Sequence, residues 1–206
     1  MKTRTEIINM LFRKYGFQSY LEIGVEVPAV NFDKINAAFK ECVDPNPLGK
    51  CTYIMTSDDF FKNYAKNKKY DVIFVDGMHT AEQVRRDVYN SINYLNGNGF
   101  IILHDCNPPT EYHVRSYEEY LATKGQWNGT VFKAFVELKH ELSDWCCFVI
   151  DEDWGCGVIT KRKIFQNKQL NFDFYNFTWK EFEKNRKELL QLVTFDEYDK
   201  SINNQL

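Results

Sequence analysis

Short apolar segments alternate with amphipathic ones along the first half of the chain, and this alternation limits the fold more than any other feature of the sequence. Residues 70–75 and 100–103 are almost entirely apolar, which is typical of parallel strands buried on both faces. Between them, residues 80–95 place apolar side chains at intervals of three and four, the period of an amphipathic helix. The pattern predicts strands that alternate with helices, and hence a mostly parallel sheet covered on both faces.

The remaining elements are predicted by the same criteria. Further strands are expected at residues 20–23, 40–43, 52–55, 145–150 and 157–160. The last two are joined by a short polar turn, which favours an antiparallel hairpin. Helices are expected over residues 3–15, around Phe32, Ile35 and Phe39, after Thr56, over 131–142 and over 178–198. We therefore expect one α/β domain over residues 1–206, with a Rossmann-like, doubly wound, mostly parallel seven-stranded sheet and an antiparallel C-terminal hairpin edge.

Composition argues against several classes of protein. The 26 basic and 29 acidic side chains are scattered and leave a formal net charge of −3, so no basic patch indicates nucleic acid or an anionic membrane as a partner. The N-terminus is charged, and no apolar run approaches the roughly 18 residues of a membrane span. The six cysteines form no CxxC pair, so reduced thiols are expected. These features predict a cytoplasmic protein that acts on small molecules.

Polar residues concentrate where the predicted strands end, at the edge where open α/β sheets bind ligands. Asp44 follows the second strand, 20 residues after Gly24, where a carboxylate can accept hydrogen bonds from ribose hydroxyls. The turn after Gly24 contains Glu26 and Pro28, so it lacks the glycine cradle that a dinucleotide pyrophosphate requires. An NAD-dependent oxidoreductase is therefore disfavoured. S-adenosylmethionine has a ribose and an adenine but no phosphate, and it suits this turn.

The third predicted strand ends in a second acidic group. Asp58 is placed there to accept a hydrogen bond from the adenine amino group, with Ser57 beside it. The same residues are typical of a helix N-cap, which is the alternative interpretation.

Six short motifs occur in this region: Tyr20-Leu21-Glu22-Ile23-Gly24-Val25, Asn31-Phe32-Asp33-Lys34-Ile35, Val43-Asp44-Pro45, Met55-Thr56-Ser57-Asp58, Ile73-Phe74-Val75-Asp76-Gly77-Met78-His79-Thr80 and Leu103-His104-Asp105-Cys106-Asn107-Pro108. Together they resemble the class I methyltransferases that are grouped as methyltransferase family 24. They agree with the family in order and spacing between residues 18 and 110, and the segment 154–159 resembles bacterial members. The resemblance implies S-adenosylmethionine as the methyl donor, held by Glu22, Gly24, Asp44, Ser57, Asp58 and Asp76.

One position departs from the family pattern. Relatives carry a second glycine in the turn after Gly24, where this chain has Val27-Pro28-Ala29. A side chain at that point could crowd the methionine part of the cofactor.

Three residues are predicted to carry the chemistry: His79, Asp76 and Asp105. His79 is the candidate general base for an acceptor hydroxyl, because imidazole titrates near neutral pH; alternatively it caps the following helix. Asp76 and Asp105 end neighbouring predicted strands, so both carboxylates could bind Mg²⁺, with Asn107 or His104 completing the shell. Metal-dependent O-methyltransferases resemble this arrangement, and the ion would lower the pKa of the acceptor hydroxyl.

The segments after the fifth predicted strand are expected to bind the acceptor. Trp127, Trp154, Tyr112 and Tyr117 lie there, and aromatic faces suit sugar rings or planar molecules, although packing also explains each of them. Cys106 has no adjacent base and is expected to be buried rather than a nucleophile.

The leading hypothesis is an S-adenosylmethionine-dependent methyltransferase that acts on a hydroxyl of a small molecule or saccharide. The alternative is a non-methylating, nucleoside- or metal-binding protein that keeps the fold, and its motivation is the Val27-Pro28 pair. An aromatic helix near the C-terminus permits a homodimer without requiring one.

Overall fold

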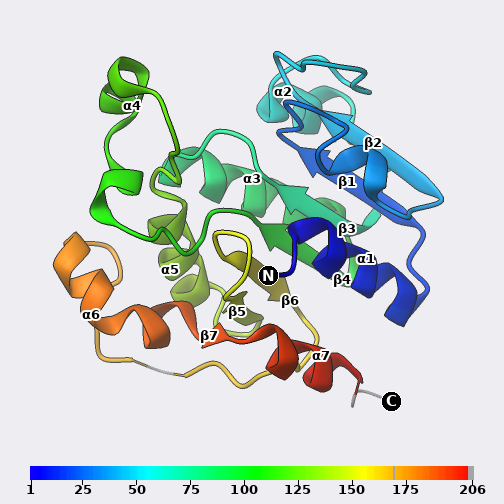
Figure 1. The fold of residues 1–206 in the computed structure, drawn as a ribbon. Coiled ribbons are helices and arrows are strands. Elements are labelled where there is room, and N and C mark those ends of the chain that lie inside the picture. Colours follow the sequence, from blue (N-terminus) through cyan, green and yellow to red (C-terminus); the bar gives the residue numbers. More distant parts are fainter. Residues whose placement is uncertain (169, 204–206) are drawn as a thin grey trace.

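The computed structural model describes residues 1–168 and 170–203, and a seven-stranded sheet with helices on both faces lies at its centre (Figure 1). The strands are β1 (Ser19–Ile23), β2 (Phe39–Val43), β3 (Tyr70–Val75), β4 (Leu95–Leu103), β5 (Cys146–Ile150), β6 (Cys156–Thr160) and β7 (Leu192–Val193). Their order across the sheet is β2-β1-β3-β4-β6-β5-β7. The first four neighbours are parallel, β6 is antiparallel to both β4 and β5, and β7 is parallel to β5. The predicted α/β class, the doubly wound arrangement and the antiparallel hairpin are confirmed.

Helices cover the two faces of the sheet unequally. The helices are α1 (Arg4–Tyr15), α2 (Ser57–Asn63), α3 (Ala81–Tyr94), α4 (Tyr117–Thr123), α5 (Val131–Glu141), α6 (Trp179–Leu190) and α7 (Phe195–Asn203). The core on one face includes side chains of α1 and α7, while that on the other includes α2, α3, α5 and α6. Helix α4 has no buried residue and stands out from the body of the protein (Figure 1). None of the helices within the described ranges has the length and apolarity that a membrane crossing requires.

Strand β3 shows why the sheet needs cover on both sides. Val72 and Phe74 point into the core beneath α1 and α7, whereas Ile73 and Val75 point into the core beneath α3 and α5. Because side chains alternate along a strand, an almost unbroken apolar run places apolar groups on both faces. The prediction that this strand is buried on both faces is confirmed.

Helix α1 delivers a charged residue to the carboxyl ends of the strands. Thr3 and Glu6 form a capping box at its start, and Gly16 ends it with a φ of 63°. The capping box fixes the first turn of α1, which contains Arg4. The Arg4 guanidinium lies 4.0 Å from the carboxylate of Asp76, which follows β3.

The helix expected around Phe32, Ile35 and Phe39 is wrong. Only a single turn of 3-10 helix forms, over Phe32–Lys34, and Phe39 begins β2. Phe32 and Ile35 are buried against the same core as α1. The Asn9 side chain of α1 accepts from the Asn36 backbone N–H at 2.8 Å and donates to the Lys34 carbonyl at 2.9 Å. A side chain from another element thus supplies the hydrogen bonds that a longer helix would have made itself.

The strand expected at residues 52–55 is reduced to one bridge, between Val43 and Tyr53. Ile54 is 66% exposed, so the segment does not continue the two-sided burial of a central strand. The seventh strand is instead β7, which lies outside the predicted hairpin edge and pairs with β5.

The single C-terminal helix expected over residues 178–198 is also wrong, because it is divided into α6, β7 and α7. Gln191 adopts a left-handed conformation, with φ 49° and ψ 54°, and ends α6. Leu192 and Val193 then pair with Val149 and Ile150 of β5. Backbone pairing with the free edge of β5 therefore stabilises Leu192 and Val193 more than continuation of α6 would.

Candidate active site at the carboxyl ends of the strands

A cavity of about 800 Å³ opens at the carboxyl ends of β1, β2, β3 and β4. Its wall includes residues of the turns after these strands, of α1, α2 and α3, and of the segment around α4. The lining residues used below are Arg4, Gly24, Val27, Asp44, Ser57, Asp58, Asp76, His79, Gln83, Asp87, His104, Asp105, Tyr117, Tyr120 and Trp127. This is the edge of an open α/β sheet at which ligands bind.

Gly24 brings two of these turns into contact. Its φ is 81°, and a Cβ at this position would lie 2.2 Å from the Asp76 carbonyl oxygen. Only glycine allows the turn after β1 to approach the turn after β3 this closely.

Asp44 holds the turn that follows β1. Its Oδ2 accepts from the N–H groups of Val25 at 2.9 Å and Glu26 at 2.8 Å, and its Oδ1 accepts from Asn46 N–H at 2.7 Å. A carboxylate has about four lone-pair sites, so one site remains for a hydroxyl of a ligand. The predicted ribose carboxylate therefore lies on the cavity wall, with room for one of the two ribose hydroxyls.

Pro28, the residue that departs from the family pattern, does not line the cavity. It is buried against the loop after β2, where a Cβ on Gly49 would meet the Pro28 ring at 2.9 Å. Val27 does reach the wall. The prediction that a side chain of this turn crowds the methionine part of the cofactor therefore concerns Val27 rather than Pro28, and it stays a prediction.

Glu22 lies beneath the cavity wall rather than on it. It is 2% exposed, and its Oε2 accepts from the Tyr20 hydroxyl at 2.6 Å and from the Asn31 amide at 2.9 Å. Burial raises the pKa of Glu22 to about 8, and the charge of Asp76 acts in the same direction. Its part in cofactor binding stays a prediction, which the position of the side chain does not favour.

Helix α2 and helix α3 form one end of the cavity. Thr56 caps α2, accepting from the Asp59 N–H, so Ser57 and Asp58 stand in its first turn. Asp58 is half exposed, and one of its oxygens lies 3.6 Å from the Arg86 guanidinium. Sequence reasoning missed Asp87 at this end, because it is hidden within the polar positions of an amphipathic helix.

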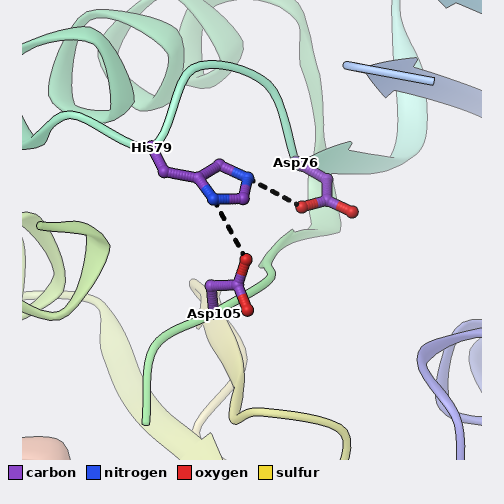
Figure 2. A group of neighbouring side chains, drawn as sticks. All are labelled: Asp76, His79 and Asp105. Carbon is purple, nitrogen blue, oxygen red and sulfur yellow. Dashed lines mark ion pairs between the residues drawn. The ribbon is translucent and has the colours of Figure 1, made fainter. Parts of the chain in front are cut away.

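The three predicted catalytic residues lie together at the other end of the cavity. The His79 ring lies between two carboxylates, with Nε2 at 3.4 Å from Asp76 Oδ1 and Nδ1 at 3.2 Å from Asp105 Oδ2 (Figure 2). Burial lowers the pKa of His79, but the hydrogen bond to Asp76 and the charge of Asp105 outweigh it and raise that pKa above its ordinary value. The pKa of Asp76 lies well below its usual range, because His104 and His79 outweigh the effect of burial. Asp76 is therefore ionised.

His104 adds a second imidazole behind the first. Its Nδ1 lies 3.3 Å from Asp76 and 3.4 Å from Asp105, while its Nε2 lies 3.5 Å from Asp153. Although burial lowers the pKa of His104, these carboxylates raise it well above the ordinary value. Arg4 contributes a further positive charge, 3.5 Å from Asp153. Arg4 Nη1 also lies 2.9 Å from His104 Nε2. Two imidazoles and one guanidinium thus lie among the three carboxylates of Asp76, Asp105 and Asp153.

The segment after α4 contacts two of the predicted catalytic residues, His79 and Asp105. The Trp127 carbonyl lies 3.1 Å from His79 Nδ1, and the Asn128 amide donates to Asp105 Oδ1 at 2.6 Å. A Cβ on Gly129 would lie 2.0 Å from the His79 carbonyl, so only glycine fits this crossing. Because a carbonyl can only accept, the proton of neutral His79 resides on Nδ1 and leaves a lone pair on Nε2.

Asn107, one of the two residues considered for completing the metal shell, is engaged elsewhere. Its Oδ1 accepts from Arg186 at 2.6 Å, and its amide donates to Asp151 at 2.8 Å. Cys106, which was weighed as a nucleophile, is fully buried, as predicted, and burial raises the pKa of its thiol well above the ordinary value. The ligand atoms of Asp76, His79 and Asp105 lie within 4.8 Å of one another, so these three residues could hold an ion.

Aromatic rings line the cavity beside His79. Trp127 stacks on the His79 ring at 5.6 Å between centroids, and Tyr120 stacks on Trp127 at 4.6 Å. Tyr117 also lines the wall, whereas the predicted Trp154 and Tyr112 do not belong to it.

The fold and this cavity define a protein with the class I methyltransferase fold. Residues 36–106, about a third of the chain, match a family model described as a methyltransferase domain, which confirms the resemblance to methyltransferase family 24 over that stretch. No curated protein matches the chain.

Solved structures of low sequence identity share the fold. One is a methyltransferase of Podospora anserina bound to S-adenosylhomocysteine, with 16% identity, a TM-score of 0.55 and coverage of 79% of this chain and 80% of that one. Another is an O-methyltransferase from Bacillus cereus in complex with S-adenosylhomocysteine, with 12% identity, a TM-score of 0.53 and coverage of 78% and 83%. The predicted Rossmann-like methyltransferase fold is confirmed.

Proposed function

We propose that this protein transfers a methyl group from S-adenosylmethionine to a hydroxyl oxygen of a small molecule or saccharide. One observation carries the proposal: a single open cavity contains both a carboxylate suited to a ribose, Asp44, and an imidazole suited to take a proton, His79. The methyltransferase-domain match and the S-adenosylhomocysteine-bound structures of the same fold support the choice of methyl donor.

The residues on the wall can divide the work of this reaction. Asp44 accepts a hydrogen bond from the ribose, and Gly24 keeps the neighbouring turns close enough to enclose the ligand. When bound, S-adenosylmethionine supplies an electrophilic methyl group on a sulfonium. His79 Nε2 takes the proton of the acceptor hydroxyl, and Asp76 then stabilises the protonated ring. General-base assistance of this kind contributes on the order of 10²-fold to 10⁴-fold in rate.

A divalent ion is the second part of the proposal. Asp76 and Asp105 would each give one oxygen, and an imidazole nitrogen of His104 would complete the set, which leaves His79 Nε2 free to act as the base. When bound, the ion would lower the pKa of the acceptor hydroxyl. Mg²⁺ and Mn²⁺ prefer oxygen ligands, whereas imidazole suits Zn²⁺, so a set of two carboxylates and one imidazole admits either kind of ion.

We place the acceptor against the aromatic wall of the cavity, which is formed by Tyr117, Tyr120 and Trp127. Aromatic faces of this kind pack against the apolar face of a sugar or against a planar ring. The acceptor partner is thus a small molecule or saccharide.

Isotope-labelled S-adenosylmethionine tests the proposal. The purified protein is incubated with labelled donor and panels of saccharides and phenols, in EDTA, Mg²⁺ or Mn²⁺, and products are analysed by mass spectrometry. We expect an oxygen-linked methyl group, formation that falls by at least about 100-fold in His79→Gln, and stimulation by a divalent ion that is lost in Asp105→Asn. Methyl groups on nitrogen or carbon, or undiminished transfer by His79→Gln, would contradict it. Binding of the donor's nucleoside part without any transfer would favour the non-methylating alternative.

A further inference from the structure

Asp87 is an unexpected carboxylate at the α2–α3 end of the cavity. It lines the cavity although the residue as a whole is only 1% exposed. The other carboxylate at this end, Asp58, is half exposed and lies beside the guanidinium of Arg86. Placing a carboxylate in so dry a position is costly unless it is hydrogen-bonded, and such groups in clefts are candidates for binding.

The neighbours of Asp87 orient it without saturating it. The Gln83 amide donates to Asp87 Oδ1 at 3.1 Å and also to Ser57 Oγ at 3.2 Å, and Ser57 contributes a further hydrogen bond to Asp87. Gln83 is itself fixed, because its carbonyl accepts from Arg86. Two partners occupy about half of the lone-pair sites of a carboxylate. Burial raises the pKa of Asp87 to about 6, which accords with this dry position.

The position of Asp87 within the cavity identifies what it would meet. If Asp44 receives the ribose and His79 marks the place of methyl transfer, the nucleobase must extend from the ribose away from His79. We place the base against Ser57, Gln83 and Asp87, which line the same cavity and belong to its α2–α3 end rather than to the group around His79. Adenine presents an amino group on its edge, and a carboxyl oxygen is an acceptor for it.

We propose that Asp87 selects the nucleobase of the methyl donor, accepting a hydrogen bond from the adenine 6-amino group while Gln83 holds the carboxyl in place. This inference rests on the proposed function and deepens it. A base with a carbonyl at the same position would set two acceptor oxygens against each other, so the site excludes hypoxanthine as well as recognising adenine.

A double-mutant cycle between protein and ligand tests the contact. Calorimetry measures the affinity of S-adenosylhomocysteine and of its 6-desamino analogue for the wild type, for Asp87→Ala and for the control Asp33→Ala, which removes an exposed carboxylate that does not line the cavity. We expect the wild type and Asp33→Ala to prefer the amino-bearing ligand about tenfold, the value of a hydrogen bond to a charged group, and Asp87→Ala to bind both ligands within about twofold. The ratio compares two ligands on the same folded protein, so a general loss of stability does not mimic the result.

A second variant tests whether Asp87 contacts the base or only supports the structure around it. Asp87→Asn keeps the size of the side chain and adds a donor, so the affinity of S-inosylhomocysteine relative to S-adenosylhomocysteine should rise at least about fivefold. A full tenfold preference for the amino group in Asp87→Ala, its loss in Asp33→Ala, or an unchanged ratio in Asp87→Asn would overturn this inference alone. Failure of the wild type to bind S-adenosylhomocysteine would overturn the proposed function as well.

Discussion

Replacing Glu22 by Gln should make the protein more stable at alkaline pH. Glu22 is buried beneath the cavity, and burial raises its pKa from 4.5 to about 8. Gln keeps an oxygen that can accept from Tyr20 and Asn31, as Glu22 does now. It removes the charge that the buried site disfavours.

The sign and size of the effect follow from linkage between protonation and folding. Because the pKa of Glu22 is raised in the folded state, the folded protein binds the proton more tightly than the unfolded chain does. The stability that this provides is complete below pH 4.5 and is lost as the pH rises to about 8. A shift of this size corresponds to a loss on the order of 5 kcal/mol, as an upper value. Glu22→Gln should lack this loss.

Urea denaturation at pH 5, 7 and 9 measures the difference. The matched control is Glu41→Gln, because Glu41 is a buried carboxylate whose pKa is lowered: burial raises it, but hydrogen bonds from Lys68, Tyr70 and Tyr53 outweigh that effect. That variant should lose stability above pH 4.5 and keep the alkaline decline of the wild type. An alkaline decline in Glu22→Gln equal to that of the wild type would refute the argument.

Three further predictions concern catalysis and local strain. His79→Gln should lower kcat by about 10²-fold to 10⁴-fold and leave the Kd of S-adenosylhomocysteine unchanged, and a parallel loss of binding would speak against a general base. In the wild type, kcat/KM should rise with pH through a midpoint above 6.5, because the base must be neutral and its pKa is raised in the unliganded protein; a midpoint below 6.5 would count against it. Lys124 has φ 56° and ψ −160°, a conformation that favours glycine, so Lys124→Gly should increase the free energy of unfolding by about 1 kcal/mol. A decrease in urea-measured stability would show that the Lys124 side chain matters more than the strain.

The central strands and α3, the helix between β3 and β4, were predictable because the sequence of each follows a single hydrophobic pattern. In β3 every residue but Asp71 is apolar, and in α3 the apolar residues follow one helical period. Such segments form the same structure in almost any surrounding. The ligand edge was predictable for a related reason, since Gly24, Asp44, Asp76 and Asp105 directly follow strands whose ends must lie together.

The errors arose where a distant segment decides the local structure. Asn9 of α1 supplies the hydrogen bonds that end the turn after Phe32, and the free edge of β5 draws Leu192 and Val193 out of a helical pattern. No local window of sequence contains that information. A non-glycine residue in the left-handed conformation, such as Gln191, leaves no composition signal either.

The same limitation applies to the site. The side chains from the turns were predicted. Arg4, Asn128 and Asp153 come from segments far away in the sequence, and only the fold brings Arg4 to Asp76, Asn128 to Asp105 and Asp153 to His104. Asp87 occupies a polar position of α3 that a helical pattern assigns to solvent, although the residue is 1% exposed.

Titration of the protein with S-adenosylhomocysteine by calorimetry tests the central claim most directly. We predict saturable binding to the wild type and to the control Asp33→Ala, which removes an exposed carboxylate that does not line the cavity. Binding to Asp44→Asn should be at least about tenfold weaker, since a hydrogen bond from a ribose hydroxyl to a charged acceptor is lost. Absence of binding at millimolar ligand, or equal binding by Asp44→Asn, would contradict the assignment of this cavity to the methyl donor.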